Sequence, residues 1–199
     1  LVRRHDMIKD FLQLDPSLTA AIIPGSPYAE KIGQYTDSLN IESIIHMPME
    51  SYEKEKWKYE IDLNEKLNAD LVEKRVRRAF KEVPTALGMN NHRGSKATES
   101  LQLMKDLART LKKMDKFFLD SFTNPESRGY ITMRRFGVPT QLRQVFLDHL
   151  ENSELIKTNL DKNCMITWAI EKKIAFFLCE NRIFFCENHI FSVKIASFS

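Results

Sequence analysis

The chain has 199 residues, of which 43% are hydrophobic and 29% are charged, a composition that is ordinary for a globular domain. The formal net charge is only +3, and the basic residues are not interleaved with aromatic ones, so we do not expect nucleic-acid binding. No run of about 18 apolar residues, the length that suggests a membrane span, occurs in the sequence. A secretory signal is not visible either.

Short apolar runs recur along the chain and are separated by segments with helical spacing. These runs cover residues 19–23, 41–45, 85–89, 117–119, 145–147 and 174–178. Uninterrupted runs of this length are typical of strands that are buried on both faces of a parallel sheet. The alternation of such strands with helices predicts an α/β fold built from βαβ units, with a parallel sheet or barrel.

The segments between the apolar runs carry start and stop signals of helices. Ser26, Asn68 and Thr98 each precede a segment with helical spacing and are predicted to cap it. Gly137 is predicted to end a shorter helix, because glycine is the usual residue just beyond a helix C-terminus. A less regular helix is expected over residues 153–173.

The connection over residues 51–67 is longer and strongly charged. We expect it to form a solvated loop above the ends of the strands, because its charge density does not suit a core. A substrate-binding role for Trp57 and Tyr59, which lie within it, is the alternative.

Polar side chains that can carry chemistry follow four of the predicted strands. They are His46, His92, Asp120 and Asp148. The carboxyl ends of parallel strands meet at one edge of a sheet or barrel, so these side chains are expected to gather there.

The two histidines suggest a metal site. Neutral imidazoles suit zinc and other borderline metals, and a catalytic zinc usually has three protein ligands and a water molecule. Such a metal polarises a carbonyl and lowers the pKa of its water, which is what amide or ester hydrolysis needs. Asp120 or Asp148 could then accept a proton or orient a ligand histidine. The structural alternatives are hydrogen-bonded histidines and aspartates that cap helices or hold loops.

Four motifs in chain order resemble those of the divergent polysaccharide deacetylase family. Residues 46–50 (His-Met-Pro-Met-Glu) are similar to its His-x-Pro-Met-Glu signature, and residues 88–95 to its Gly-Val-Asn-Asn-His-Met-Gly-Ser segment. Residues 117–121 resemble its Phe-x-Asp-Ser strand. Residues 137–139, followed by residues 143–148, look like its Gly-Val-Pro and Arg-Asp-Val-Phe-Leu-Asp pair.

The resemblance implies a distorted (β/α) barrel of the glycoside hydrolase/deacetylase type, related to NodB-like carbohydrate esterases. It implies a divalent metal, usually zinc, held by an Asp and two His, which by motif position are His46 and His92. The implied activity is hydrolysis of acetyl groups from a carbohydrate substrate, in a periplasmic or other extracytoplasmic location. Asp120 or Asp148 would accept a proton or orient a metal-binding histidine. The residues that would position the substrate are Asn91, Ser95 and Arg143.

The sequence departs from the family pattern in two places, and both departures lower the activity that we expect. The family opens with a strand that ends in an Asp-Asp pair, and this chain is expected to begin after it, which predicts an incomplete barrel over residues 1–178. The family's closing Ile-Gly-His strand has no match, so residues 179–199 are expected to be a divergent tail. Weak or absent activity would follow unless another segment or chain completes the barrel. The alternative hypothesis is a non-catalytic relative that binds a glycan or a protein partner.

Overall fold

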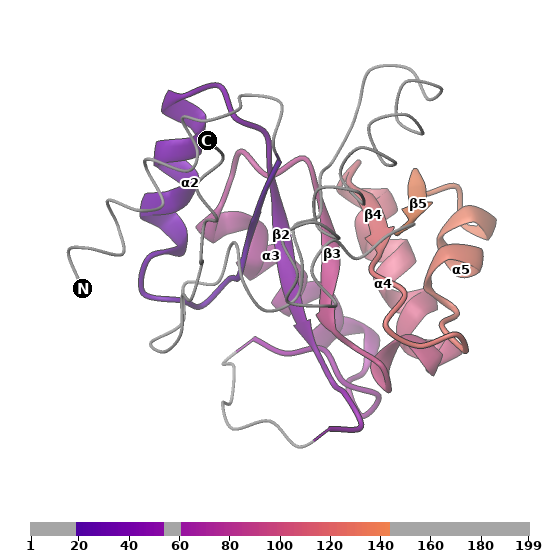
Figure 1. Cartoon of the computed structure of the whole chain (residues 1–199). Coiled ribbons are helices and arrows are strands. Elements are labelled where there is room, and N and C mark those ends of the chain that lie inside the picture. Colours follow the sequence, from indigo (N-terminus) through magenta and orange to yellow (C-terminus); the bar gives the residue numbers. More distant parts are fainter. Residues whose placement is uncertain (1–18, 54–60, 144–199) are drawn as a thin grey trace, which may run out of the picture.

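A computed structural model of the chain describes residues 19–53 and 61–143, which form a parallel sheet with helices between its strands (Figure 1). The elements are β1 (Ala20–Ile22), α2 (Ala29–Ser38), β2 (Ser43–Met49), α3 (Ala69–Glu82), β3 (Gly88–Arg93), a 3-10 turn (Ala97–Glu99), α4 (Leu101–Lys113), β4 (Phe117–Asp120), α5 (Gly129–Arg135) and β5 (Thr140–Leu142). The predicted alternation of strands and helices is confirmed over these residues.

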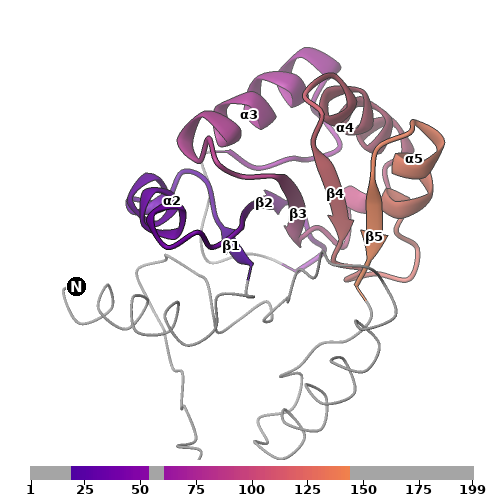
Figure 2. The same ribbon diagram turned by 90° about the horizontal axis from the view of Figure 1, so that it is seen from above.

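The sheet keeps the order of the chain. Its five strands lie in the order β1-β2-β3-β4-β5, and each neighbouring pair is parallel. In an open doubly wound sheet the strand order reverses and helices cover both faces. Here the order does not reverse, and Figure 2 shows α2, α3, α4 and α5 along one side of the curved sheet. The described residues are therefore consistent with the incomplete (β/α) barrel that the sequence predicted.

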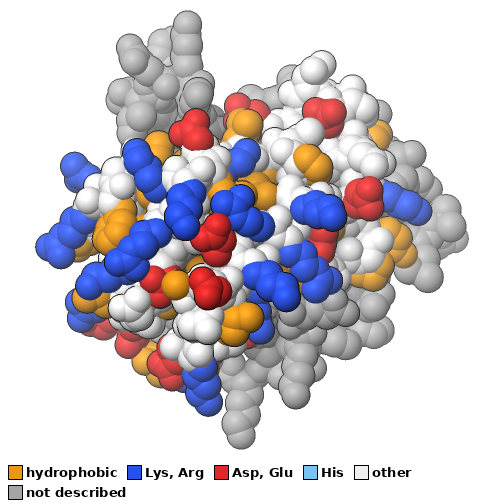
Figure 3. Space-filling model, turned by 180° about the vertical axis from the view of Figure 1, so that it is seen from behind, with side chains coloured by type: hydrophobic (Ala, Val, Ile, Leu, Met, Phe, Trp, Pro, Cys, Tyr) orange, Lys and Arg blue, Asp and Glu red, His pale blue; other side chains and the backbone are white. Residues whose placement is uncertain are grey.

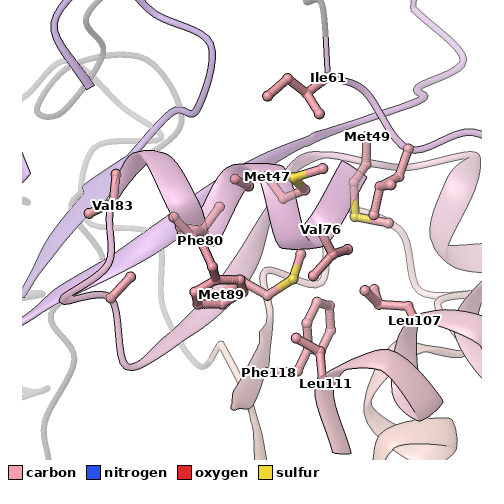
Figure 4. Packing of buried hydrophobic residues seen from close by; sticks show 14 of the residues in the cluster. Met47, Met49, Ile61, Val76, Phe80, Val83, Met89, Leu107, Leu111 and Phe118 are labelled. Atoms are coloured by element: carbon pink, nitrogen blue, oxygen red, sulfur yellow. The ribbon is translucent and has the colours of Figure 1, made fainter. Parts of the chain in front are cut away.

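The core fills the space between this helical layer and the sheet (Figure 4). Met47, Met89 and Phe118 contribute from three adjacent strands, and each is 0% exposed. Val76 of α3 and Leu107 of α4 close the layer from the other side, also at 0% exposure. The sheet can therefore bury its helix-facing side chains entirely, as the apolar runs in the sequence suggested.

The helix caps agree with the sequence at one of the three predicted positions. Asn68 caps α3 by accepting a hydrogen bond from the backbone N–H of Leu71 at 2.9 Å. Ser26 does not cap α2, which begins at Ala29 without a side-chain cap, so that prediction is wrong.

The prediction that Thr98 caps α4 is also wrong. Ser100 holds the cap position, and its hydroxyl accepts from the backbone N–H of Leu103 at 3.4 Å. Thr98 lies in the 3-10 turn before it, where its hydroxyl donates to the carbonyl of Gly94 at 2.8 Å. The added turn moves the start of α4 beyond the residue that the sequence pattern favoured.

Three strands, β2, β3 and β4, run further than the apolar runs predicted, and β4 includes Asp120. β2 extends to Met49 and β3 to Arg93, so His46 and His92 lie within strands and do not follow them. The cause is that polar side chains in these positions are buried and paired, which lets the ladder continue through them. β5 was not predicted at all. The strands expected at residues 145–147 and 174–178, and the helix at 153–173, lie outside the described residues.

The described end of the charged connection after β2 is partly buried, which corrects the expectation of a solvated loop for these residues. Ile61 and Leu63 are 1% and 0% exposed, respectively. Leu63 pairs with Met49, and its N–H donates to the carbonyl of Pro48 at 2.8 Å. The returning chain thus covers the end of β2. Trp57 and Tyr59 lie outside the described residues.

The outer surface of the helical layer is highly charged, and Figure 3 shows many Lys and Arg side chains there with a few Asp and Glu among them. Lys113 of α4 joins Glu73 of α3 at 2.9 Å, an exposed pair of the kind that adds little stability. Among the described helices, none has the length and apolar character needed to cross a membrane.

The core assignment predicts a strong contrast between two identical substitutions in α4. Leu107→Ala should lower the free energy of unfolding by about 2–5 kcal/mol, because it opens a cavity at a position that is 0% exposed. Leu101→Ala is the matched control, since Leu101 is 40% exposed, and it should cost less than about 1 kcal/mol. Urea denaturation followed by circular dichroism measures both. Equal losses would contradict the packing described for α4.

Candidate functional site

The structure brings His46 and His92 into contact. β2 and β3 pair so that Pro48 lies opposite His92, and His46 lies opposite Asn90. His46 Nε2 and His92 Nδ1 are 3.1 Å apart, and the two ring centroids are separated by 4.8 Å. The sequence placed both histidines on adjacent strands, and the parallel register sets them side by side.

Both imidazoles are buried, with 7% of His46 and 5% of His92 exposed. Burial disfavours the charged form, and it lowers the pKa of His46 to about 4, although the hydrogen bond to Asn90 opposes part of this shift. Burial also lowers the pKa of His92 well below its ordinary value, and positive charge on His46 and Arg93 adds to the effect. Both rings are therefore neutral at pH 7, which is the form that binds metals.

Asn90 and Ser121 complete the polar cluster. Asn90 Oδ1 lies 2.8 Å from His46 Nδ1, and its Nδ2 donates to the hydroxyl of Ser121 at 3.2 Å. Both side chains are buried, at 1% and 4% exposure. Neither residue is among the site residues that the sequence predicts. The signal that could have found Asn90 is strand alternation, because residues two apart in a strand face the same way, and Asn90 precedes His92 by two.

Alternation also explains why Asn91 lies on the other face of β3. Its side chain is 0% exposed and bonds only to backbone in the contacts seen here: Oδ1 accepts from the N–H of Ser121 at 2.8 Å, and Nδ2 donates to the carbonyl of Arg93 at 2.7 Å. Asn91 thus ties β3 to the end of β4. The structure does not place it beside the histidine pair, and its predicted substrate contact remains a prediction.

Asp120 is likewise turned away from the histidines. It follows Leu119, which pairs with Asn90, so alternation sends the Asp120 side chain to the helix-facing side of β4. Its carboxylate accepts from the N–H of Phe122 at 2.9 Å, the hydroxyl of Ser127 at 2.7 Å and the N–H of Tyr130 at 3.0 Å. These bonds hold the start of α5, which is the structural alternative weighed for this residue. Asp148 lies outside the described residues.

Ser95 and Arg143 lie at the ends of the strands and also bind backbone groups. The Ser95 hydroxyl accepts from the N–H of Tyr52 at 3.1 Å. Arg143 donates from Nε to the carbonyl of Ser121 at 2.5 Å and from an Nη atom to that of Phe122 at 3.0 Å. Arg143 therefore braces the backbone next to the polar cluster, and contact of either residue with a substrate stays a prediction.

The donor set fits part of a metal site. Two nitrogen ligands of a tetrahedral zinc lie roughly 3.3 Å apart, given bonds of about 2.0–2.1 Å. The 3.1 Å between His46 Nε2 and His92 Nδ1 is close to that spacing. Within residues 19–53 and 61–143, however, no group of three or more His, Cys, Asp or Glu side chains is arranged to hold a metal ion. The described residues thus offer two neutral nitrogen ligands and no third.

The chain belongs to the divergent polysaccharide deacetylase family, whose family model matches residues 2–179. It is 30% identical over 151 residues to an uncharacterized protein of Escherichia coli (strain K12), YibQ, covering 76% of this chain and 47% of that protein. It is 38% identical over 131 residues to an uncharacterized protein of Haemophilus influenzae, covering 66% of this chain and 46% of that protein. The chain thus spans about half the length of these curated relatives.

A solved structure supports the fold. The crystal structure of an uncharacterized protein from Agrobacterium tumefaciens C58 superposes with a TM-score of 0.74, covering 84% of this chain and 68% of that one. The sequence identity is 18%, so this likeness concerns the fold alone.

The buried imidazoles predict an acid-sensitive fold. The pKa of His46 is about 4 in the folded chain and 6.5 as its ordinary value, so the unfolded chain binds more protons between these pH values. Stability is therefore retained above about pH 6.5 and lost as the pH falls towards 4, by up to about 1.4 kcal/mol per pH unit for this one group.

Replacing His46 by Gln should remove that part of the pH slope. The measurement is urea denaturation of both proteins at several pH values between 7 and 4.5, with a chelator present so that only the metal-free state is compared. Wild-type stability should fall more steeply than that of His46→Gln. Parallel pH profiles would mean that His46 is not held in its neutral form.

Proposed function

We propose that this chain carries the histidine part of the metal centre of a carbohydrate deacetylase, a hydrolase that removes acetyl groups from N-acetylated or O-acetylated sugars. The observation that carries the proposal is the pair of buried, neutral imidazoles, His46 and His92, whose nitrogens lie 3.1 Å apart. The divergent polysaccharide deacetylase family to which the chain belongs supplies the substrate class.

In this proposal His46 and His92 hold a divalent metal, and the metal we propose is zinc. When bound, the metal would polarise the acetyl carbonyl and lower the pKa of a water molecule. Asn90 orients His46 through the 2.8 Å contact with its Nδ1, in the manner of the outer-shell partners that metal-binding histidines usually have. We assign the third protein ligand to a segment outside the described residues.

Asp120 and Asp148 are the two candidates for proton transfer. The three hydrogen bonds that tie Asp120 to its own turn and to α5 weigh against Asp120. We therefore assign the proton-transfer role to Asp148. Asn91, Ser95 and Arg143 stay candidates for positioning the sugar, and Ser95 and Arg143 lie at the strand ends. An extracytoplasmic location is part of the proposal and rests on the family.

The second candidate function is a non-catalytic relative that binds a glycan or a protein partner. It is favoured by one observation, the two-ligand donor set within the described residues. Absence of zinc binding would favour this second hypothesis, because a glycan-binding or partner-binding surface does not need zinc.

Zinc should stabilise the chain through the histidine pair. At 100 times its dissociation constant, a ligand adds about 2.7 kcal/mol to stability, which for a chain of this size raises the melting temperature by about 5–10 °C. A thermal melt with zinc, compared with a melt in chelator, should show this rise for the wild type and for Asn64→Ala, a control in the loop before α3. His46→Gln and His92→Gln should not show it. A rise that survives in both histidine variants would place the zinc elsewhere.

Acetate release tests the reaction itself. Zinc-loaded protein should release acetate from an acetylated oligosaccharide, such as a short chitin oligomer or an O-acetylated xylan fragment, and His92→Gln should reduce the rate by at least about 100-fold, since it removes a metal ligand. Enzymatic detection of free acetate measures both rates. Zinc binding without acetate release from either class of substrate would favour the non-catalytic alternative.

A further inference from the structure

We propose that Ser121 and Asn90 are positioning residues that fix the tautomer of His46, with the proton on Nδ1 and the lone pair of Nε2 directed towards His92. The inference about the tautomer stands on hydrogen-bond directions alone, and only its use in metal binding rests on the proposed function.

The directions of these hydrogen bonds follow from the contact between Ser121 and the backbone of Asn91. The Ser121 hydroxyl lies 2.7 Å from the backbone carbonyl of Asn91. A carbonyl oxygen can only accept, so the hydroxyl must donate its single proton to Asn91. That proton is then not available for the contact with Asn90, and towards Asn90 the Ser121 oxygen can only accept.

This requirement sets the orientation of the Asn90 amide. The group that faces Ser121 at 3.2 Å must be the donor, Nδ2, which leaves Oδ1 facing His46 Nδ1 at 2.8 Å. An amide oxygen only accepts, so Nδ1 of His46 carries the hydrogen. A neutral imidazole has one proton, so in the metal-free chain Nε2 of His46 accepts from His92 Nδ1 at 3.1 Å. Metal binding at this pair of nitrogens then requires the His92 proton to move to its Nε2.

The backbone around Ser121 is itself held from two sides. The N–H of Ser121 donates to Asn91 Oδ1 at 2.8 Å, and Arg143 Nε donates to its carbonyl at 2.5 Å. The next residue, Phe122, has a φ of 48°, a left-handed conformation that is rare for a bulky side chain. Asp120 Oδ1 accepts from the Phe122 N–H at 2.9 Å, and Arg143 donates to its carbonyl at 3.0 Å.

Asp120 and Arg143 therefore act together. Their hydrogen bonds stabilise the unfavourable left-handed turn at Phe122, and this turn keeps the Ser121 hydroxyl between Asn90 and the backbone of β3. Their effect on His46 is transmitted through Ser121 and Asn90, which makes them positioning residues as well. This accounts for why both are polar and partly or fully buried while neither contacts the imidazoles in the bonds described above.

The tautomer can be read directly in metal-free protein. In protein labelled with 15N in its histidines, two-bond couplings between ring nitrogens and carbon-bound protons distinguish Nδ1–H from Nε2–H imidazoles. His46→Gln identifies the His46 signals by their loss. The wild type at pH 7.5 with chelator should show His46 as the Nδ1–H tautomer only.

Ser121→Ala should release the amide of Asn90, so that His46 samples both tautomers and zinc binds about 10–100-fold more weakly. Ser121→Thr retains the hydroxyl and should restore the single tautomer. Thr110→Val is the matched control, since it removes a buried hydroxyl that bonds to the Asp106 carbonyl within α4 at 2.9 Å, and it should leave both the tautomer and zinc affinity unchanged. Thermal melts confirm that each variant is folded at the temperature used.

An Nε2–H tautomer for His46 in the wild type would overturn the proposal, as would a single Nδ1–H tautomer that persists in folded Ser121→Ala. The proposed function can fail separately. If the wild type binds no zinc but shows the Nδ1–H tautomer that Ser121→Ala disrupts, the positioning role stands and the metal centre does not. If Ser121→Ala is unfolded, Asn90→Leu decides, because it removes the acceptor for the Nδ1–H; a single Nδ1–H tautomer in folded Asn90→Leu would overturn the proposal.

Discussion

The register between β2 and β3 is the constraint on which the rest of the site depends. Parallel pairing sets His46 opposite Asn90 and Pro48 opposite His92, so both imidazoles face the same side of the sheet. A slip of either strand by one residue would turn that strand's polar side chains to the helical layer and separate the two imidazoles. That slip is prevented by the opposite face, where Met47 and Met89 are packed in the core at 0% exposure. Packing of the apolar faces therefore fixes the register of the two strands, and the register fixes the positions of the polar side chains.

Burial of the polar side has its own cost, and the hydrogen bonds of the cluster offset it. An unpaired buried polar group costs about 1–3 kcal/mol, and charge costs considerably more. The imidazoles avoid both costs, because they are neutral and because they are hydrogen-bonded to one another, to Asn90 and through Asn90 to Ser121. The same dry surroundings that lower the pKa of His46 to about 4 keep its ring in the form that can act as a ligand. Burial of the cluster therefore both excludes water and keeps the imidazoles in the neutral form that binds metals.

The sequence predicted the architecture better than the details of the site. Apolar runs located β1 to β4, and the two histidines could be placed together because consecutive parallel strands tend to be neighbours. The apolar runs stop at the first polar residue, however, whereas β2 and β3 continue to Met49 and Arg93. Only this continuation shows that Asn90 faces the same side as His92, whereas the family resemblance pointed to Asn91. Ser121 could not be found this way, because its role depends on a left-handed turn at Phe122 that no local pattern announces.

The commitment of Asp120 to its own turn leaves the histidine pair without negative charge in the described residues. Two neutral imidazoles bring no charge to a divalent cation, and a buried site that held one with these ligands alone would retain its full double charge. Transfer of such a charge from water is strongly unfavourable unless an anionic group is close to it. An anionic third ligand, such as a carboxylate or a thiolate, would offset that charge. The aspartate that the family resemblance implies is one such ligand.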